Sequence, residues 1–206
     1  MPYPKIKLVG LLGGSFDPPH QGHVHISNLA IKLFELDEVW WIVSPGNPLK
    51  NEKPASYEER SEKAQSIIRN PRIKVSEFEY LYGIKHTCDT VIKLKQKYLH
   101  HRFVWLMGSD NLVQIVHWKS WDLIFDSIPI VVLSRTNLDL PGLASKAASC
   151  YANYYIPSRI ARRIVYHQPP AWTLIKTPKI NISSSKYRAK GLWKAKDYQD
   201  GSKLAG

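Results

Sequence analysis

Residues 13–23 read Gly-Gly-Ser-Phe-Asp-Pro-Pro-His-Gln-Gly-His and are more informative about fold and function than any other part of the chain. An apolar run at residues 6–12 precedes them and is typical of a buried strand. Gly13 and Gly14 predict a tight turn after that strand, which would let backbone N–H groups approach a ligand. The two prolines that follow fix φ just before a helical pattern begins.

Two histidines stand at the start of that helical pattern. His20 and His23 are three residues apart, so both imidazoles would lie on one side of the first helical turn. Gly22 between them has no side chain that would obstruct an incoming group. A helix start also presents unsatisfied N–H donors and the positive end of the helix dipole. Together these features predict an anion site for a phosphate chain, in preference to an ordinary turn with incidental histidines.

The composition is that of a soluble globular protein. The chain has 206 residues, of which 44% are hydrophobic and 22% charged, so we expect one domain over residues 1–206, with a helical extension and tail at 189–206. No apolar stretch approaches the length of a membrane span. The two cysteines, Cys88 and Cys150, have no metal-type spacing, which favours a cytoplasmic location.

The net charge of +12 is compatible with nucleic-acid binding, with highly anionic nucleotide substrates, or with a basic proteome. Basic residues recur between residues 186 and 203, and we interpret those after residue 190 as a solvated helix face and tail. Nucleic acid is therefore not the expected partner.

Apolar runs alternate with helical patterns along the chain. Strands are predicted at residues 6–12, 39–43, 73–75, 103–107 and 130–133, and helices at 23–34, 57–69, 87–98 and 111–125. Alternating strands and helices favour an α/β fold, a Rossmann-like doubly wound parallel sheet. Residues 137–149 have the least pattern and are predicted to form a loop.

The informative segments each follow a predicted strand. They are residues 13–23, 44–50, 108–111 and 134–135. Open α/β sheets bind ligands beyond the carboxyl ends of their strands, so this placement predicts one cleft formed by several loops.

A second phosphate-binding element is predicted near the C-terminus, where residues 179–188 read Lys-Ile-Asn-Ile-Ser-Ser-Ser-Lys-Tyr-Arg. Serines at a helix start cap free N–H groups, and their hydroxyls can also hold phosphate oxygens. Arg188 follows on the same helix and is suited to bidentate contact with a phosphate. The alternative is a capped terminal helix with an exposed arginine, and the histidine pair favours the phosphate site.

These motifs resemble those of a known family. Ser-Phe-Asp-Pro followed by His-Gln-Gly-His at residues 15–23 resembles the His-x-Gly-His signature of the nucleotidylyltransferase superfamily. Ile-Ser-Ser-Ser-Lys-Tyr-Arg at 182–188 is similar to the Ile-Ser-Ser-Thr-x-x-Arg element of the adenylyltransferases that make pyridine dinucleotides. Segments 86–90, 108–112 and 117–121 resemble further elements of the bacterial nicotinate-mononucleotide adenylyltransferases, in the same order.

The resemblance implies transfer of the adenylyl group of ATP to nicotinate mononucleotide, in NAD biosynthesis. It implies catalytic roles for His20, His23 and Arg188, and Mg²⁺ carried on the ATP phosphates. The ATP site would comprise those three residues with Gly13, Gly14, Ser15, Phe16, Gly108, Asp110, Ile182, Ser183 and Ser184.

On the acceptor side, the resemblance implies that Trp118 stacks on the pyridine ring and Thr87 binds the nicotinate carboxylate or the mononucleotide phosphate. Lys50 and Arg135 are further candidates for contact with phosphate. From the residues alone, Trp118 is equally compatible with a core aromatic, Asp110 with a helix cap, and Arg135 with a surface ion pair.

Other functions are weaker interpretations. Phosphopantetheine adenylyltransferases share the opening motif but are usually shorter, and nicotinamide mononucleotide differs from the expected acceptor by one carboxylate. A basic nucleic-acid-binding protein on a non-catalytic version of the fold is the alternative from another class. No membrane partner is expected, and the sequence leaves open whether the protein is a homo-oligomer.

Overall fold

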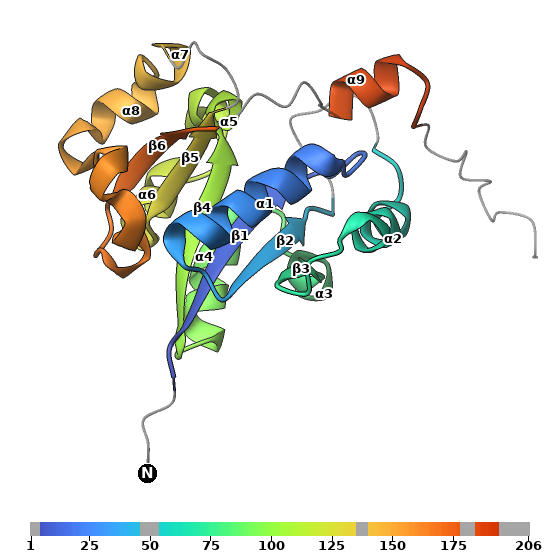
Figure 1. Ribbon diagram of the computed structural model, residues 1–206, viewed down its shortest axis with the longest axis horizontal. Helices are drawn as coiled ribbons and strands as arrows, with labels where there is room; N and C mark the ends of the chain where they lie inside the picture. The colour runs from blue at the N-terminus through green and yellow to red at the C-terminus, as the bar shows by residue number, and fades with distance from the viewer. Residues whose placement is uncertain (1–4, 46–53, 135–139, 178–183, 194–206) are drawn as a thin grey trace, which may run out of the picture.

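The computed structural model describes residues 5–45, 54–134, 140–177 and 184–193, and in these ranges six parallel strands form one sheet (Figure 1). The strands are β1 Lys7–Gly14, β2 Glu38–Val43, β3 Ile73–Ser76, β4 His101–Gly108, β5 Ile130–Ser134 and β6 Trp172–Lys176. Their order is β3-β2-β1-β4-β5-β6, and each pairs parallel to its neighbour. The direction of winding therefore reverses between β1 and β4, at the centre of the sheet.

The five predicted strands are confirmed, and β6 was not predicted. Its sequence, Trp-Thr-Leu-Ile-Lys, lacks the continuous apolar run of the central strands. It pairs with β5 at the edge of the sheet, where a strand tolerates polar residues, and its Trp172 also forms a single parallel bridge with Tyr155.

Helical segments connect the strands. The α-helices are α1 Gln21–Phe34, α2 Tyr57–Ile67, α3 Phe78–Leu81, α4 Thr87–Lys97, α5 Ser109–Gln114, α6 Trp121–Ser127, α7 Leu140–Leu143, α8 Lys146–Cys150 and α9 Ser184–Ala189. Three 3₁₀ segments are η1 Ile115–His117, η2 Ala152–Tyr154 and η3 Ser158–Tyr166. Within the described ranges, no helix is long and apolar enough to cross a membrane.

Two hydrophobic cores lie on opposite faces of the sheet. Val9 and Leu11 of β1 pack in one core with α4, α5 and α6, while Leu8 and Leu12 pack in the other with α1 and η3. Successive strand residues point to opposite faces, so this division follows from the alternation along β1. The predicted doubly wound sheet is confirmed.

Two predicted segments differ from the structure. The helix expected at residues 111–125 is divided into α5, η1 and α6, because Ser120 adopts a left-handed φ of 46° immediately before α6. The loop expected at 137–149 contains α7 and α8. Ser145 caps α8 by accepting a hydrogen bond from the Ala148 N–H at 3.2 Å, so a short capped helix forms there without a strong apolar periodicity.

Candidate active site

The β1–α1 connection does not turn at its glycines, so this prediction was wrong. Gly13 and Gly14 are the last two residues of β1, and the left-handed conformation occurs at Phe16, with φ of 47°. Gly13 is required for space, because a Cβ atom there would lie 2.5 Å from two ring carbons of Trp105. Phe16 is buried and stacks on Trp41 with ring centroids 4.9 Å apart, which fixes the bend.

The two histidines lie against each other, as predicted. Their ring centroids are 3.8 Å apart, His20 is the N-cap of α1, and His23 is in its first turn. The backbone N–H of His20 donates to Nδ1 of His23 at 3.1 Å. In a neutral imidazole with Nδ1 as acceptor, Nε2 carries the proton, so His23 is prepared as a hydrogen-bond donor for an anion.

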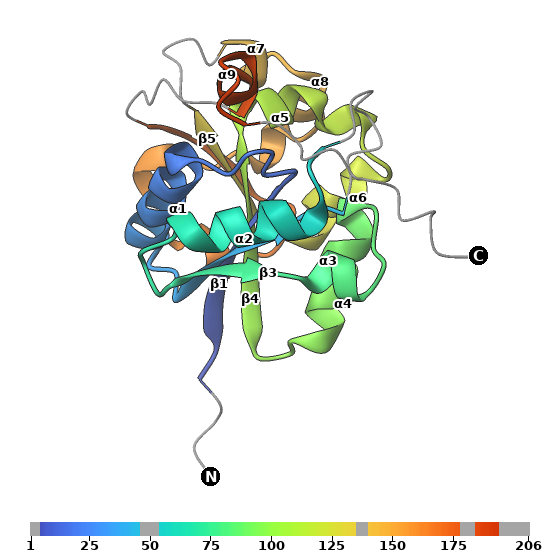
Figure 2. The same cartoon turned by 90° about the vertical axis from the view of Figure 1, so that its right-hand side faces the viewer.

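Helix α9 lies at the end of the sheet toward which the strands point, beside the β1–α1 connection (Figures 1 and 2). Ser184 Oγ donates to the backbone oxygen of Pro18 at 2.9 Å, and Arg188 donates to the backbone oxygen of Asp17. The Tyr187 ring lies 6.2 Å from that of His20. Segments separated by more than 160 residues of sequence are therefore in contact at this end of the sheet.

The carboxyl ends of β1 and β4 adjoin at the point where the winding reverses. The register pairs Leu12 with Leu106, and two residues further along both strands end in glycine, at Gly14 and Gly108. Gly108 is buried and caps α5, and Asp110 is exposed in the first turn of that helix. These positions border the crevice in which open parallel sheets bind nucleotides.

The candidate acceptor residues Thr87 and Trp118 lie in neighbouring segments. Thr87 begins α4, and Trp118 follows η1. The Lys119 ammonium lies 3.4 Å from the Asp89 carboxylate, so the segments that carry the two candidates are in contact. Trp118 is half-buried and packs against the core with part of its ring system, which agrees with its alternative interpretation as a core aromatic.

Four predicted site residues are outside the described ranges. They are Lys50, Arg135, Ile182 and Ser183. The described part of the predicted C-terminal extension ends at residue 193.

Arg60 of α2 was not predicted and is central to the site. Its side chain is fully buried and donates to four backbone oxygens, those of Ser15, Ser44, Pro45 and Ala55, at 2.6–3.2 Å. Burial lowers the pKa of the Arg60 guanidinium, and the nearby Asp17 carboxylate opposes that shift. Arg60 thus connects the β1–α1 loop to the end of β2 and the start of α2.

The feature of the sequence that could have predicted a buried role for Arg60 is its position on the inward face of α2. Tyr57, Ser61 and Ala64 on the same helix are buried, and a charged residue among buried positions indicates a satisfied internal role.

Glu79 of α3 is a second buried ionisable group that the sequence analysis missed. Thr90 Oγ1 of α4 lies 2.7 Å from Glu79 Oε1, and Glu79 is only 5% exposed. Burial raises the pKa of Glu79 to about 7, although the Thr90 hydrogen bond lowers it. This contact fixes α3 against the first turns of α4, next to Thr87.

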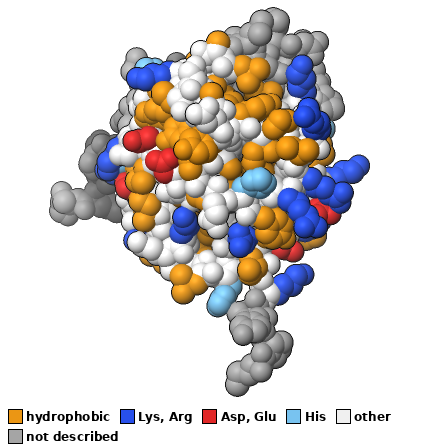
Figure 3. All heavy atoms as spheres, turned by 90° about the vertical axis from the view of Figure 1, so that its left-hand side faces the viewer, with side chains coloured by type: hydrophobic (Ala, Val, Ile, Leu, Met, Phe, Trp, Pro, Cys, Tyr) orange, Lys and Arg blue, Asp and Glu red, His pale blue; other side chains and the backbone are white. Residues whose placement is uncertain are grey.

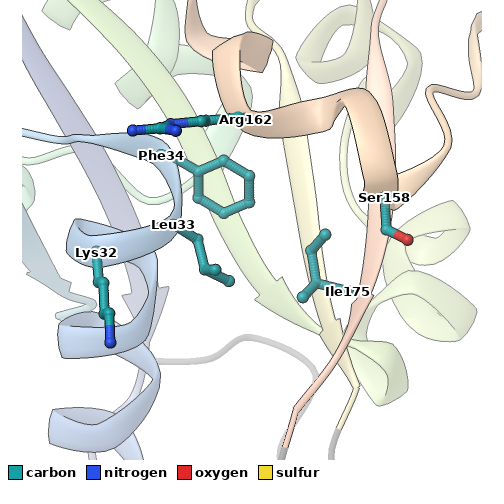
Figure 4. Close-up of a pocket in the computed structure, with 6 residues that line it drawn as sticks. All are labelled: Lys32, Leu33, Phe34, Ser158, Arg162 and Ile175. Atoms are coloured by element: carbon teal, nitrogen blue, oxygen red, sulfur yellow. The ribbon is translucent and has the colours of Figure 1, made fainter.

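A cavity of about 440 Å³ lies elsewhere, between α1, η3 and β6 (Figure 4). Its lining residues are Lys32, Leu33, Phe34, Ser158, Arg162 and Ile175, none of which is a predicted site residue. The space-filling view in Figure 3 shows Lys and Arg side chains gathered along one side of the face that it presents, with a few acidic side chains among them. The net charge is therefore visible at the surface as well as in the composition.

The reversal of winding at β1 and β4, with histidine and arginine side chains beside it, is the architecture of a nucleotide-binding α/β protein. The chain belongs to the cytidylyltransferase-like family, whose model matches residues 11–190.

Relatives within this family are similar over most of their length. A protein of Ruegeria pomeroyi named probable nicotinate-nucleotide adenylyltransferase is 43% identical over 189 residues, which cover 92% of this chain and 89% of that protein. A Cereibacter sphaeroides protein of the same name is 46% identical over 187 residues, covering 91% and 99%.

A solved structure has the same fold. Plasmodium falciparum nicotinic acid mononucleotide adenylyltransferase complexed with NaAD superposes with a TM-score of 0.67 at 20% identity, covering 89% of this chain and 83% of that one.

Proposed function

We propose that the protein transfers the adenylyl group of ATP to nicotinate mononucleotide, forming nicotinate adenine dinucleotide and pyrophosphate in NAD biosynthesis. The names of relatives that are more than 40% identical over about nine-tenths of the chain support this substrate pair. The structural observation that carries the proposal is the contact of α9 with the β1–α1 loop, which gathers Ser184 and Arg188 beside His20 and His23.

The reaction requires positioning and charge stabilisation more than covalent help. The 5′-phosphate oxygen of the mononucleotide attacks the α-phosphorus of ATP. The bond from that phosphorus to the oxygen that bridges the α- and β-phosphates breaks, and this oxygen leaves with pyrophosphate. His23, with Nδ1 occupied by the backbone N–H of His20, offers its Nε2–H to the α-phosphate. Arg188 and Ser184 hold the departing phosphates.

Adenosine binds where β1 and β4 end. Gly14 and Gly108 leave room for close approach of the backbone, and the exposed Asp110 carboxylate accepts hydrogen bonds from the ribose hydroxyls. The acceptor binds near Thr87 and Trp118, whose half-buried ring provides a face for the pyridine.

Mg²⁺ fits this site as an ion that is bound to the phosphates of ATP. No group of three His, Cys, Asp or Glu that could hold a metal ion occurs in the described ranges, so phosphate oxygens and water would be its main ligands. When bound, it neutralises charge on the triphosphate. The protein residues that we propose to contact the same phosphates are His20, His23 and Arg188.

The test is pyrophosphate release from Mg-ATP, with nicotinate mononucleotide and nicotinamide mononucleotide compared under the same conditions. We expect turnover with the nicotinate form, reduced about 100- to 1,000-fold in His23→Ala, since one donor to the developing charge is removed. Equal turnover with the nicotinamide form would contradict the stated preference. Release with pantetheine phosphate but with neither pyridine nucleotide would overturn the proposed acceptor.

A further inference from the structure

Asp17 is the point at which α9 and the residues after it meet the β1–α1 loop. Its side chain is 9% exposed, and its Oδ1 accepts from the backbone N–H of Ala55 at 3.3 Å. The Arg188 guanidinium donates to its backbone oxygen and lies 3.7 Å from its Oδ2. Asp17 therefore faces the arginine that the proposed function assigns to the ATP phosphates.

Trp193 supplies a further contact to the same carboxylate. Its indole Nε1–H donates to Asp17 Oδ1 at 2.7 Å, across 176 residues of sequence. Trp193 lies beyond residues 11–190, the part of the chain that matches the family model. This contact therefore involves a residue outside the part of the chain that the family model covers.

The two carboxylate oxygens of Asp17 have different partners. Oδ1 is held by the Trp193 indole and the Ala55 N–H, so the orientation of the carboxylate is fixed. Oδ2 is left facing Arg188, whose side chain is 28% exposed. A guanidinium has five N–H donors, so Arg188 can keep its contacts with Asp17 while other donors bind a phosphate.

We propose that Trp193 is a positioning residue for ATP: its indole N–H orients the Asp17 carboxylate, which in turn orients Arg188 toward the triphosphate. This proposal rests on the proposed function in placing Arg188 at the phosphates of ATP. It assigns Trp193 an effect on the nucleotide donor and none on the acceptor.

The test compares Trp193→Phe with Trp40→Phe. Phenylalanine keeps an aromatic ring, although a smaller one, and removes the N–H donor. The loss of ring size is common to both variants. Trp40 is the matched control, because its Nε1 also donates to a carboxylate at 2.7 Å, that of Glu38, within β2. Binding of α,β-methylene ATP with Mg²⁺ is measured by calorimetry, alongside KM for each substrate, kcat and the thermal midpoint.

We expect Trp193→Phe to weaken analogue binding and raise the KM for ATP by about three- to tenfold, part of the effect of losing a charge-assisted hydrogen bond. The KM for the acceptor, kcat and the thermal midpoint stay within about twofold or 2 °C of wild type. Trp40→Phe leaves analogue binding unchanged. Because both substitutions act on one carboxylate, adding Trp193→Phe to Asp17→Asn weakens binding no further.

Three results would overturn the inference: unchanged analogue binding in Trp193→Phe, an equal loss in Trp40→Phe, or an additive loss in the double variant. A lower thermal midpoint with both KM values raised would show a structural role instead. Failure of the proposed function is distinguishable, since wild-type protein would then not bind the ATP analogue, or would bind it without transfer to a pyridine nucleotide.

Discussion

The two halves of the candidate site are constructed differently. In the donor half, around the β1–α1 loop and α9, the key residues are buried: His20 is 4% exposed, Asp17 6% and Arg60 0%. Hydrogen bonds join Asp17 to the Trp193 indole and Arg60 to the Ser15 carbonyl. In the acceptor half, an ion pair between Lys119 and Asp89 joins the segment of Trp118 to the segment of Thr87. The two side chains are 54% and 48% exposed.

Under the proposed function, this difference predicts that the ATP side is organised before ligand binding and that the acceptor side depends more on the ligand. Buried hydrogen bonds hold one geometry because leaving a buried partner unsatisfied is unfavourable. An exposed ion pair is screened by water and salt and holds its geometry weakly. The donor half should accordingly be sensitive to substitution, and the acceptor half tolerant unless a buried group is changed.

The largest expected effect is in the donor half, from Arg60→Met. Four backbone oxygens would lose their buried donor, so we expect a loss of about 3–5 kcal/mol in the free energy of unfolding, measured by urea denaturation. Arg162→Met is the control, because the Arg162 side chain is 70% exposed and its change should have an effect below about 0.5 kcal/mol. Equal losses in the two variants would refute the central role of Arg60.

The next effect is expected from Glu79→Gln, which changes a buried acid beside the acceptor half. Burial raises the pKa of Glu79 from 4.5 to about 7, so the folded state favours the neutral acid. The stabilisation that the neutral Glu79 gives to the folded state is fully present below pH 4.5, the pKa of this group in the unfolded chain. It is lost as the pH rises toward 7, because folding must then either bury a charged carboxylate or bind a proton. Glutamine has no proton to bind and keeps a hydrogen-bonding partner for Thr90.

Urea unfolding at pH 5 and pH 7.5 measures this effect. Relative to Glu79→Gln, wild type should lose about 2 kcal/mol of stability between these pH values. The same pH dependence in both proteins would show that Glu79 is not the group responsible. A gain in wild-type stability with rising pH would reverse the sign and exclude a buried neutral acid.

The donor half was predictable because its groups lie in short contiguous motifs. His20 and His23 are three residues apart, so helix geometry alone places their rings together, and Ser184 and Arg188 share another short helix. The five central and neighbouring strands were equally evident from their apolar runs. The local sequence pattern carries no information on a contact across 166 residues, such as the one between Ser184 and Pro18. That the histidine motif and the serine–arginine motif lie close together was therefore predicted from the family resemblance and from the order of the motifs along the chain.

Arg60, Glu79 and Trp193 were missed for a common physical reason. Each acts through a partner that is distant in sequence: the Ser15 and Ser44 carbonyls for Arg60, Thr90 for Glu79, and Asp17 for Trp193. In the sequence, a charged residue on the exposed face of a helix cannot be distinguished from one on the buried face until the position of the helix against the sheet is known. The glycines were misinterpreted likewise, because Gly13 is needed for the Trp105 ring and not for a turn.

Gly13→Ala tests that steric requirement in the donor half. The added methyl would lie 2.5 Å from Cη2 and Cζ2 of the Trp105 ring, which is buried, so we expect a loss of about 1–3 kcal/mol in the free energy of unfolding. The neighbouring Gly14→Ala is the control, because its nearest contact would be the Phe16 ring at 3.6 Å, an ordinary van der Waals distance. A greater loss for Gly14→Ala would indicate that the turn interpretation of the glycines was right after all.

The smallest effect is expected in the acceptor half, from Lys119→Met. The Lys119–Asp89 pair is about half exposed on both sides, so its removal should change the free energy of unfolding by less than about 0.5 kcal/mol. Any difference from wild type in low salt should also shrink in 0.5 M NaCl, where the Debye length is only a few ångströms. A loss above about 1 kcal/mol that persists in salt would mean that this pair fixes α4 against the Trp118 segment before ligand binding. The acceptor half would then be as preorganised as the donor half.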